Sequence, residues 1–156
     1  MNDRFKTFTV LISKITRNVR KIKNQEMAEY GLRSAHVSCL YFLYLNDGLT
    51  ATDLCEQCEE DKATISRALD FLEENGYILC DAKHAKRYNS ALYLTEKGSA
   101  VGQKIADKIS CVLDEICIDL SGEERDEFYR CLAIISDNLE LCVAGINKAK
   151  KLKKKE

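Results

Sequence analysis

Three things are missing from this chain of 156 residues: a long apolar run, a strong net charge and an evident catalytic motif. The densest apolar run, Val37 to Leu45, is interrupted by Ser38 and is far shorter than the roughly 20 residues that a membrane-spanning helix needs. The N-terminus spaces its apolar residues between charges and has no continuous apolar core like that of a secretory signal. We therefore expect no membrane partner and a cytoplasmic location.

The chain also offers little from which to build an enzyme site. It has two histidines, His36 and His84, and no paired-carboxylate or nucleophile motif. We expect no catalytic activity and no cofactor, and a C-x-x-C oxidoreductase is the enzyme class that stays open. The formal net charge of −1 provides no global attraction to nucleic acid, so DNA binding would require a local basic surface.

Cys55 and Cys58, two of eight cysteines, form a C-x-x-C pair. A zinc site normally needs two further ligands at compatible spacing, and no second C-x-x-C or Cys/His pair lies near this one. Because the two thiols are three residues apart within a predicted helix, they share one face, and packing into the core is the plain interpretation. Redox sensing by the thiols and metal binding at this pair remain alternatives.

The N-terminal half predicts two helices before the central stretch. The first carries an apolar stripe at three- and four-residue steps: Phe5, Phe8, Ile12, Ile15, Val19 and Ile22. The second, capped by Ser34, is predicted from Ala35 to about Asn46 and is apolar nearly all round, so it should be central and buried. His36 and Cys39 lie one turn apart on it, either in a small-molecule effector pocket or as buried structural residues.

Between Thr50 and Gly76 the pattern predicts two short helices joined by a tight turn. Thr50 opens a capping box, T-A-T-D, for a helix through about Cys58, and Asp61 is a suitable cap for a helix from Lys62 to Glu74. On this second helix the core stripe and the opposite face separate cleanly. The stripe is Ile65, Leu69 and Leu72, and the opposite face is Ala63, Ser66, Arg67 and Asp70. A short, polar outer face is what a recognition helix needs in order to approach the major groove.

A basic hairpin follows this stretch. Tyr77 to Cys80 and Ala91 to Leu94 read as strands, and the loop between them is strongly polar. Its basic residues are Lys83, His84, Lys86 and Arg87. A hairpin with a basic tip beside a recognition helix indicates a winged helix-turn-helix, whose wing usually contacts the minor groove or the DNA backbone. An ordinary solvated hairpin is the alternative.

The segment from Leu49 to Gly98 resembles the multiple antibiotic resistance regulator (MarR) family. The resemblance is carried by TATDLCEQC, by DKATISRALDFLEENGYI, and by LYLTEKG after the wing. It implies a homodimer that binds a pseudopalindromic operator in double-stranded DNA, usually a repressor relieved by a small molecule or an oxidant. One departure is the wing sequence AKRYNS, which has no acid immediately before its basic pair, where many members carry Asp-x-Arg.

The remaining residues predict a helical dimerisation arm. Thr95 can cap a long helix with the stripe Val101, Ile105, Ile109, Val112, Ile116 and Leu120. Ser121 with Glu124 opens a last helix with the stripe Phe128, Leu132, Ile135, Leu139, Val143 and Ile146. A two-fold helical interface explains these stripes, and an intramolecular bundle is the alternative.

The expected fold class is therefore mainly α with a small β-hairpin wing: a winged helix-turn-helix domain plus a helical dimerisation arm. Within one MarR-like domain, we assign residues 1–33 and 95–147 to dimerisation, 34–94 to the DNA-binding lobe, and 148–156 to a basic, disordered tail. The expected function is sequence-specific transcriptional regulation, with a thiol-based redox or metal sensor on the same fold as the alternative. The candidate DNA-binding residues are Thr50, Thr52, Lys62, Ala63, Thr64, Ser66, Arg67, Lys83, Lys86 and Arg87.

Overall fold

The computed structural model describes residues 3–81 and 89–153, with side chains described as far as residue 146. The chain is mostly helical with one two-stranded antiparallel hairpin, so the predicted fold class is confirmed. In chain order the elements are α1 Arg4–Glu26, the 3-10 helix η1 Ala28–Tyr30, α2 Ser34–Leu45, α3 Ala51–Cys58, α4 Lys62–Glu74, β1 Ile78–Cys80, β2 Leu92–Leu94, α5 Glu96–Ile116 and α6 Gly122–Lys153. Within the described ranges, no helix is long and apolar enough to cross a membrane.

The chain divides into two compact units, Met1–Ser110 and Cys111–Glu156. The first unit contains α1 to α4, the hairpin and most of α5, and the second contains the end of α5 and all of α6. These two units do not test the predicted division into a dimerisation region, residues 1–33 and 95–147, and a DNA-binding lobe, residues 34–94. Which segments mediate dimerisation remains a prediction.

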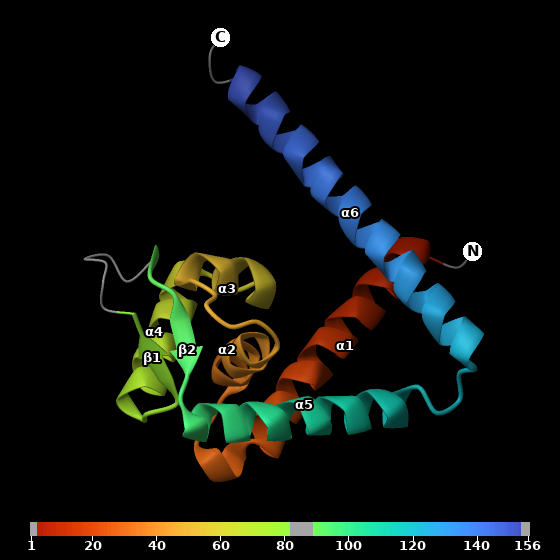
Figure 1. The fold of residues 1–156 in the computed structure, drawn as a ribbon. Helices are drawn as coiled ribbons and strands as arrows, with labels where there is room; N and C mark the ends of the chain where they lie inside the picture. Colours follow the sequence, from red (N-terminus) through yellow and green to blue (C-terminus); the bar gives the residue numbers. More distant parts are fainter. Residues whose placement is uncertain (1–2, 82–88, 154–156) are drawn as a thin grey trace. The chain divides into compact units, whose positions relative to one another are not determined.

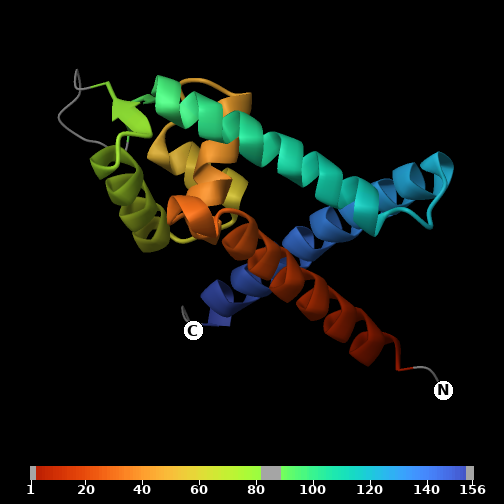
Figure 2. The same cartoon turned by 90° about the horizontal axis from the view of Figure 1, so that it is seen from below.

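Helix α2 is the centre of the first unit, as its all-round apolar sequence predicts. It contacts α1, α3, α4 and β2, and Figure 1 shows α3, α4 and β2 around it; Figure 2 shows the same arrangement from below. Helices α3 and α4 and strand β2 each contribute almost fully buried side chains to the contact with α2, whereas α1 contributes none. This core contains Cys39, Leu40, Leu43, Leu54, Ile65, Leu69, Leu72, Ile78 and Leu92. The burial of this set stabilises the packing of α3 and α4 through the hydrophobic effect.

The start of α2 differs from the prediction. Ser34 is the first residue of the helix and Arg33 occupies the cap position, so the expected Ser34 cap is wrong. The Ser34 amide instead donates to the Asn24 side chain at 2.7 Å, and the Arg33 amide donates to Nδ1 of His36 at 3.1 Å. Side chains from another segment and from the helix itself therefore satisfy the free first-turn amides.

The two central helices begin and end where the sequence predicts. The Thr50 hydroxyl accepts a bond from the Asp53 amide at 3.2 Å, and the Asp53 carboxylate accepts from the Thr50 amide at 2.8 Å. These reciprocal bonds confirm the capping box. Between the helices, Glu59 adopts a left-handed conformation with φ of 52°, which is uncommon for a residue with a side chain. The turn from α3 to α4 is thus made by a non-glycine residue, which the sequence did not indicate.

The hairpin and the start of α5 are tied to the end of α4. Strands β1 and β2 pair in antiparallel register, with Ile78 opposite Leu94 and Cys80 opposite Leu92. The Thr95 hydroxyl donates to the Gly76 carbonyl at 2.7 Å and accepts from the Gly98 amide at 3.0 Å. Thr95 therefore caps α5, as predicted, and also anchors that helix to the loop that leaves α4.

Helix α1 forms as predicted, but its apolar stripe is largely exposed. None of its residues is buried, and Phe5, Ile15 and Val19 are 77%, 52% and 41% exposed. Most of the helix therefore presents apolar surface that the described chain does not cover.

The second unit is dominated by α6. The predicted capping box is confirmed, because the Ser121 amide donates to Glu124 at 2.8 Å and the Ser121 hydroxyl accepts from the Glu124 amide at 3.2 Å. The stripe residues of α6 are exposed, as are Ile134 and Leu141 on other sides of the helix. The helix continues to Lys153, so the predicted disorder from residue 148 is wrong for the described part of the tail.

Candidate DNA-binding surface

Helix α4 has one buried face and one exposed polar face. Ile65, Leu69 and Leu72 are at most 1% exposed, which anchors the helix against α2 and α3. On the other side Lys62, Ala63 and Arg67 are exposed, and Thr64 and Ser66 are half-buried. The structure therefore brings together, on one helix, the five candidate residues that the sequence assigned to base or backbone contacts.

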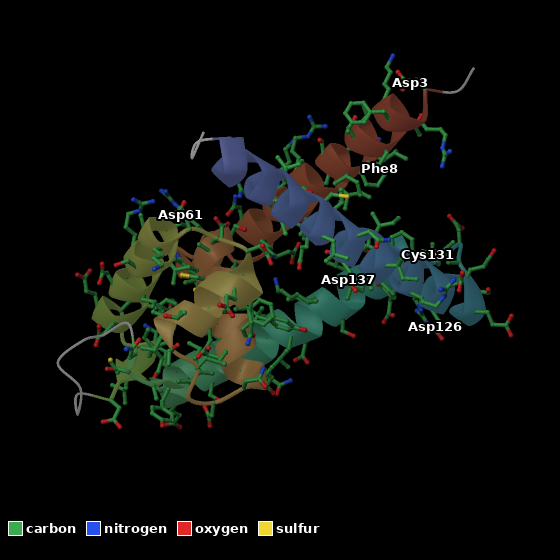
Figure 3. The ribbon with its side chains drawn as sticks, turned by 90° about the horizontal axis from the view of Figure 1, so that it is seen from above. Asp3, Phe8, Asp61, Asp126, Cys131 and Asp137 are labelled. Carbon is green, nitrogen blue, oxygen red and sulfur yellow. The ribbon has the colours of Figure 1, made fainter. Side chains whose placement is uncertain are left out.

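The N-terminus of α4 is closed by its own side chains. The Asp61 carboxylate accepts a bond from the Thr64 amide at 2.8 Å and another from the Thr64 hydroxyl at 3.1 Å. Figure 3 labels Asp61 at this end of the helix. The bond from the Thr64 amide is the main reason that the pKa of Asp61 is lowered. A carboxylate thus already occupies the position where a helix N-terminus could accept a phosphate.

Arg67 continues this network. Its guanidinium donates to the Thr64 hydroxyl at 3.3 Å, and that hydroxyl in turn donates to Asp61. Arg67 is one helical turn beyond Thr64, so the bond draws its long side chain back along the exposed face of α4. This contact limits the conformations of Arg67 before any partner arrives, which reduces the side-chain entropy that binding would cost.

At the start of α3, the polar groups are also engaged. The Thr50 hydroxyl donates to Asp53 at 2.7 Å in addition to its capping bond, while Thr52 is exposed. The pKa of Asp53 is lowered by the bonds that it accepts from the amide and hydroxyl of Thr50. Of the two threonines predicted to meet DNA phosphates, Thr52 is the more accessible one.

The surroundings of α4 are acidic. Residues 50–76, hereafter the reading unit, carry eight acidic and two basic side chains, for a net charge of −6. A hydrogen-bonded ion pair with Arg20 of α1 at 3.5 Å partly offsets Glu60. The predicted basic contacts Lys83, Lys86 and Arg87, together with His84, lie outside the described residues. Attraction to DNA must therefore come from parts of the molecule other than the reading unit.

The two candidate effector residues point to different neighbours. The His36 ring stacks on Phe71 of α4, with ring centroids 4.3 Å apart, and its Nδ1 accepts the Arg33 amide. Burial, and secondarily the charge of Arg33, lowers the pKa of His36. Cys39 is fully buried and faces α3. Each residue thus has a structural contact in the described chain, and a role of either in effector binding stays a prediction.

The two cysteines of the C-x-x-C pair pack against the core, and one of them also interacts with a third cysteine. Cys55 and Cys58 are both half-buried against the core, in line with the packing interpretation. Cys58 also interacts with Cys39 of α2: the interaction raises the pKa of the Cys39 thiol and lowers the pKa of the Cys58 thiol, and no spacing in the sequence indicates it. Among the residues that the structure describes, no group of three or more His, Cys, Asp or Glu side chains is placed to hold a metal ion.

A short helix pair with an exposed polar second helix, followed by an antiparallel hairpin, defines a winged helix-turn-helix protein. Comparisons with known proteins show which winged helix-turn-helix proteins this chain resembles. Residues 30–87 match the model of the MarR family. The curated helix-turn-helix-type transcriptional regulator YwoH of Bacillus subtilis is 25% identical over 117 residues, which cover 75% of this chain and 85% of YwoH.

Solved structures also show a likeness to transcriptional regulators of the MarR family. A MarR-family transcriptional regulator from Silicibacter pomeroyi is 27% identical, with a TM-score of 0.72, over 82% of this chain and 86% of that one. The S. aureus MepR–DNA complex is 19% identical, with a TM-score of 0.75, over 85% of this chain and 97% of that one, and shows the likeness of fold. The resemblance to the MarR family is thereby confirmed: the chain has the fold of a MarR-family transcriptional regulator, and its helix-turn-helix segment matches the model of that family.

Proposed function

We propose that this protein is a cytoplasmic, homodimeric repressor that binds a pseudopalindromic operator and is released from it by a small-molecule effector. The observation that carries the proposal is the exposed face of α4, where small and polar residues stand opposite a fully buried stripe. Such a face can enter the major groove because no bulky side chain holds the backbone away from the bases. The solved MepR structure, which has this fold, is a complex with DNA.

Within the proposal, the candidate residues divide by role. Arg67 and Ser66 read base edges, because both lie on the outer face of α4. Lys62, Ala63 and Thr64 approach the groove near the start of that helix, while Thr50 and Thr52 meet the backbone from α3. The wing residues Lys83, Lys86 and Arg87 supply the electrostatic attraction that the acidic reading unit lacks.

The exposed stripes of α1 and α6 support a dimer. Large apolar side chains along these helices remain roughly 40–80% exposed in one copy of the chain. A surface of this extent marks an interaction site in most soluble proteins. A second copy related by a two-fold axis would cover it and would place two α4 helices about one DNA turn, roughly 34 Å, apart.

The effector part of the proposal rests on the position of His36. Its ring lies between α2 and α4 on Phe71, so a ligand that displaces the ring would also disturb the packing of the reading helix. Cys39 is the weaker effector contact because it is fully buried. An effector that acts here must bind one arrangement of α4 more tightly than the other.

Selection of bound sequences from random double-stranded DNA tests the proposal as a whole. The expected outcome is an enriched motif with two inverted half-sites whose centres are about 10 base pairs apart. Enrichment of a single unrepeated half-site would refute the dimer. No enrichment at all, with purified folded protein, would refute sequence-specific recognition.

A charge-matched pair of variants then tests the recognition helix. Arg67→Ala should weaken binding to the selected operator by about 1–3 kcal/mol and relax specificity at one position of each half-site. The control Arg17→Ala removes an equal charge from the exposed face of α1 and should leave the preference for operator over random DNA unchanged. If Arg67→Ala preserved the full sequence preference, α4 would not be the recognition helix.

A double variant of the wing tests the source of the attraction. Lys86→Ala combined with Arg87→Ala removes two positive charges from the loop that the sequence directs at DNA. Affinity should fall for operator and random DNA alike, and its salt dependence should flatten, because fewer phosphates are neutralised. An unchanged salt dependence would show that the attraction comes from other basic surfaces.

A further inference from the structure

Helix α1 concentrates positive charge in a chain whose other residues are acidic overall. Residues 4–25 contain seven Lys or Arg side chains and no Asp or Glu. The other residues carry 17 Lys or Arg against 25 Asp or Glu, a net charge of −8. The near-zero net charge of the whole chain therefore conceals a strong separation of charge between α1 and the rest.

Five of these basic side chains lie on one face of α1, opposite its apolar stripe. At 3.6 residues per turn they fall within an arc of about 120°, whose centre is about 170° around the helix from that of the stripe. All five are exposed, and no acidic residue of α1 shares the arc. These residues, hereafter the basic face, are Lys6, Lys14, Arg17, Arg20 and Lys21.

The basic face is left largely without acidic partners. Among the side chains that the structure describes, Arg20 is the one member of the face that forms an ion pair, with Glu60 at 3.5 Å, and it remains 64% exposed. Exposed pairs of this kind contribute little to stability, so the guanidinium can exchange Glu60 for another anion. Lys23 lies outside the basic face and donates to the Ser38 hydroxyl at 2.9 Å. Helix α1 is thus held to α2 by a different side.

One end of the basic face lies beside the start of the proposed recognition helix. Glu60 immediately precedes Asp61, the cap of α4, so the ion pair places Arg20 next to that end of the reading unit. From Lys6 to Lys21 the face is about 22 Å long, which equals about six base pairs of duplex DNA.

We propose that the basic face of α1 binds phosphates of duplex DNA beside each half-site and supplies a sequence-independent part of the affinity. The inference rests on the proposed function, because it takes α4 as the helix on which the DNA is seated. Charge complementarity identifies the partner: the reading unit, at −6, repels phosphates, so the complex needs cations next to it. Arg20 exchanges Glu60 for a phosphate, and Arg17 and Lys21 extend the contact along the DNA backbone. No base is read by α1, and its contribution adds to that of the wing.

The salt dependence of DNA binding tests the inference. A neutral triple variant, with Lys14→Gln, Arg17→Gln and Lys21→Gln, removes three charges from the basic face and keeps good helix formers there. Affinity for the selected operator and for random duplex DNA is measured between about 50 and 200 mM salt. The slope of log affinity against log salt should fall by about two to three, because each lost phosphate contact removes about 0.9. Both affinities should fall by at least about tenfold at 0.1 M salt, with the preference for operator unchanged.

Two matched variants separate the position of the charges from their loss. A control at the end of α6 removes three charges elsewhere and should change the slope much less. A charge-retaining variant exchanges Lys for Arg and Arg for Lys at the three positions in α1, and it should bind DNA as the wild type does, because phosphate attraction depends on charge. Sedimentation of the neutral triple variant should show wild-type self-association, because the basic face lies opposite the apolar stripe. The control has Lys148→Gln, Lys150→Gln and Lys151→Gln.

The possible results separate this inference from the proposed function. An unchanged slope in the neutral triple variant, or an equal flattening by the control in α6, overturns the inference and leaves the proposed function intact where operator is still preferred. A flattened slope in protein that prefers no DNA sequence refutes the proposed function and leaves phosphate binding by α1. If the neutral triple variant instead loses binding to vesicles of phosphatidylserine and phosphatidylcholine, with an unchanged slope on DNA, the face belongs to an anionic membrane surface and the inference is overturned.

Discussion

Replacing Gly98 with alanine should destabilise the protein, because the added Cβ atom would collide with the backbone of Tyr77. A Cβ atom added at Gly98 would lie 1.9 Å from the Tyr77 carbonyl oxygen and 3.2 Å from Cδ2 of Leu94. The first distance is far below any ordinary contact, and the obstructing atom belongs to the backbone, so a side-chain rotation cannot relieve it. Helix α5 would have to move away from the segment that enters β1 by roughly 1 Å or more.

The size of the effect follows from two opposing contributions. Overpacking of this kind costs about 1–3 kcal/mol, here at the upper end because backbone must move. Alanine regains about 1 kcal/mol over glycine through its higher helix propensity. The net loss is therefore about 2 kcal/mol, which for a chain of this length lowers the melting temperature by roughly 4–8 °C.

Thermal melting followed by far-ultraviolet circular dichroism measures this loss, and two other glycines provide a graded comparison. At Gly102 an added Cβ would lie 2.9 Å from Cβ of Tyr44, a side-chain atom, so Gly102→Ala should cost less than Gly98→Ala. At Gly145 an added Cβ meets nothing within 4 Å, so Gly145→Ala should be neutral or stabilising by up to about 1 kcal/mol. A Gly98→Ala protein that melted at the wild-type temperature would refute the reasoning.

Two further predictions concern pH and assembly. The lowered pKa of His36 means that the folded state binds its proton less readily than the unfolded state. Its contribution to stability should therefore be complete above a pH of about 6.5 and decline as the pH falls below that value. His36→Gln should flatten this part of the urea-unfolding profile, and an unchanged profile would contradict the role of the ring. For the proposed dimer, Leu139→Glu should raise the dissociation constant measured by sedimentation at least about tenfold, because a two-fold interface contains the change twice. The control Ala144→Glu, about 140° around the helix at 3.6 residues per turn, should raise it much less, and equal effects would exclude the stripe as the interface.

Much of the fold could be predicted because its signals are local. A capping bond spans three residues, so Thr50, Asp61, Thr95 and Ser121 each marked the start of a helix correctly. The buried stripe of α4 also follows from helical periodicity within the segment itself. The exposed face of α4, and with it much of the candidate site, could be assigned by the same reasoning.

What the sequence could not show depends on distant segments. The first amide of α2 is satisfied by Asn24, ten residues earlier, so a local capping rule selected Ser34 incorrectly. The effect of Cys58 in raising the pKa of Cys39 depends on two helices, α2 and α3, that are brought together by the packing of the core. The pairing of Arg20 with Glu60 likewise spans forty positions and has no sequence pattern of its own.

The acidity of the reading unit has a consequence for how such a regulator would search a genome. Non-specific binding depends almost entirely on phosphate neutralisation, and an operator competes with about a million to a billion other sites. A reading unit with a net charge of −6 is repelled by the DNA phosphates at every site, whatever the base sequence. That repulsion weakens non-operator complexes and correct ones by a similar amount, but base contacts restore only the correct ones. A modest intrinsic affinity would then occupy an operator with little of the protein retained elsewhere on the chromosome.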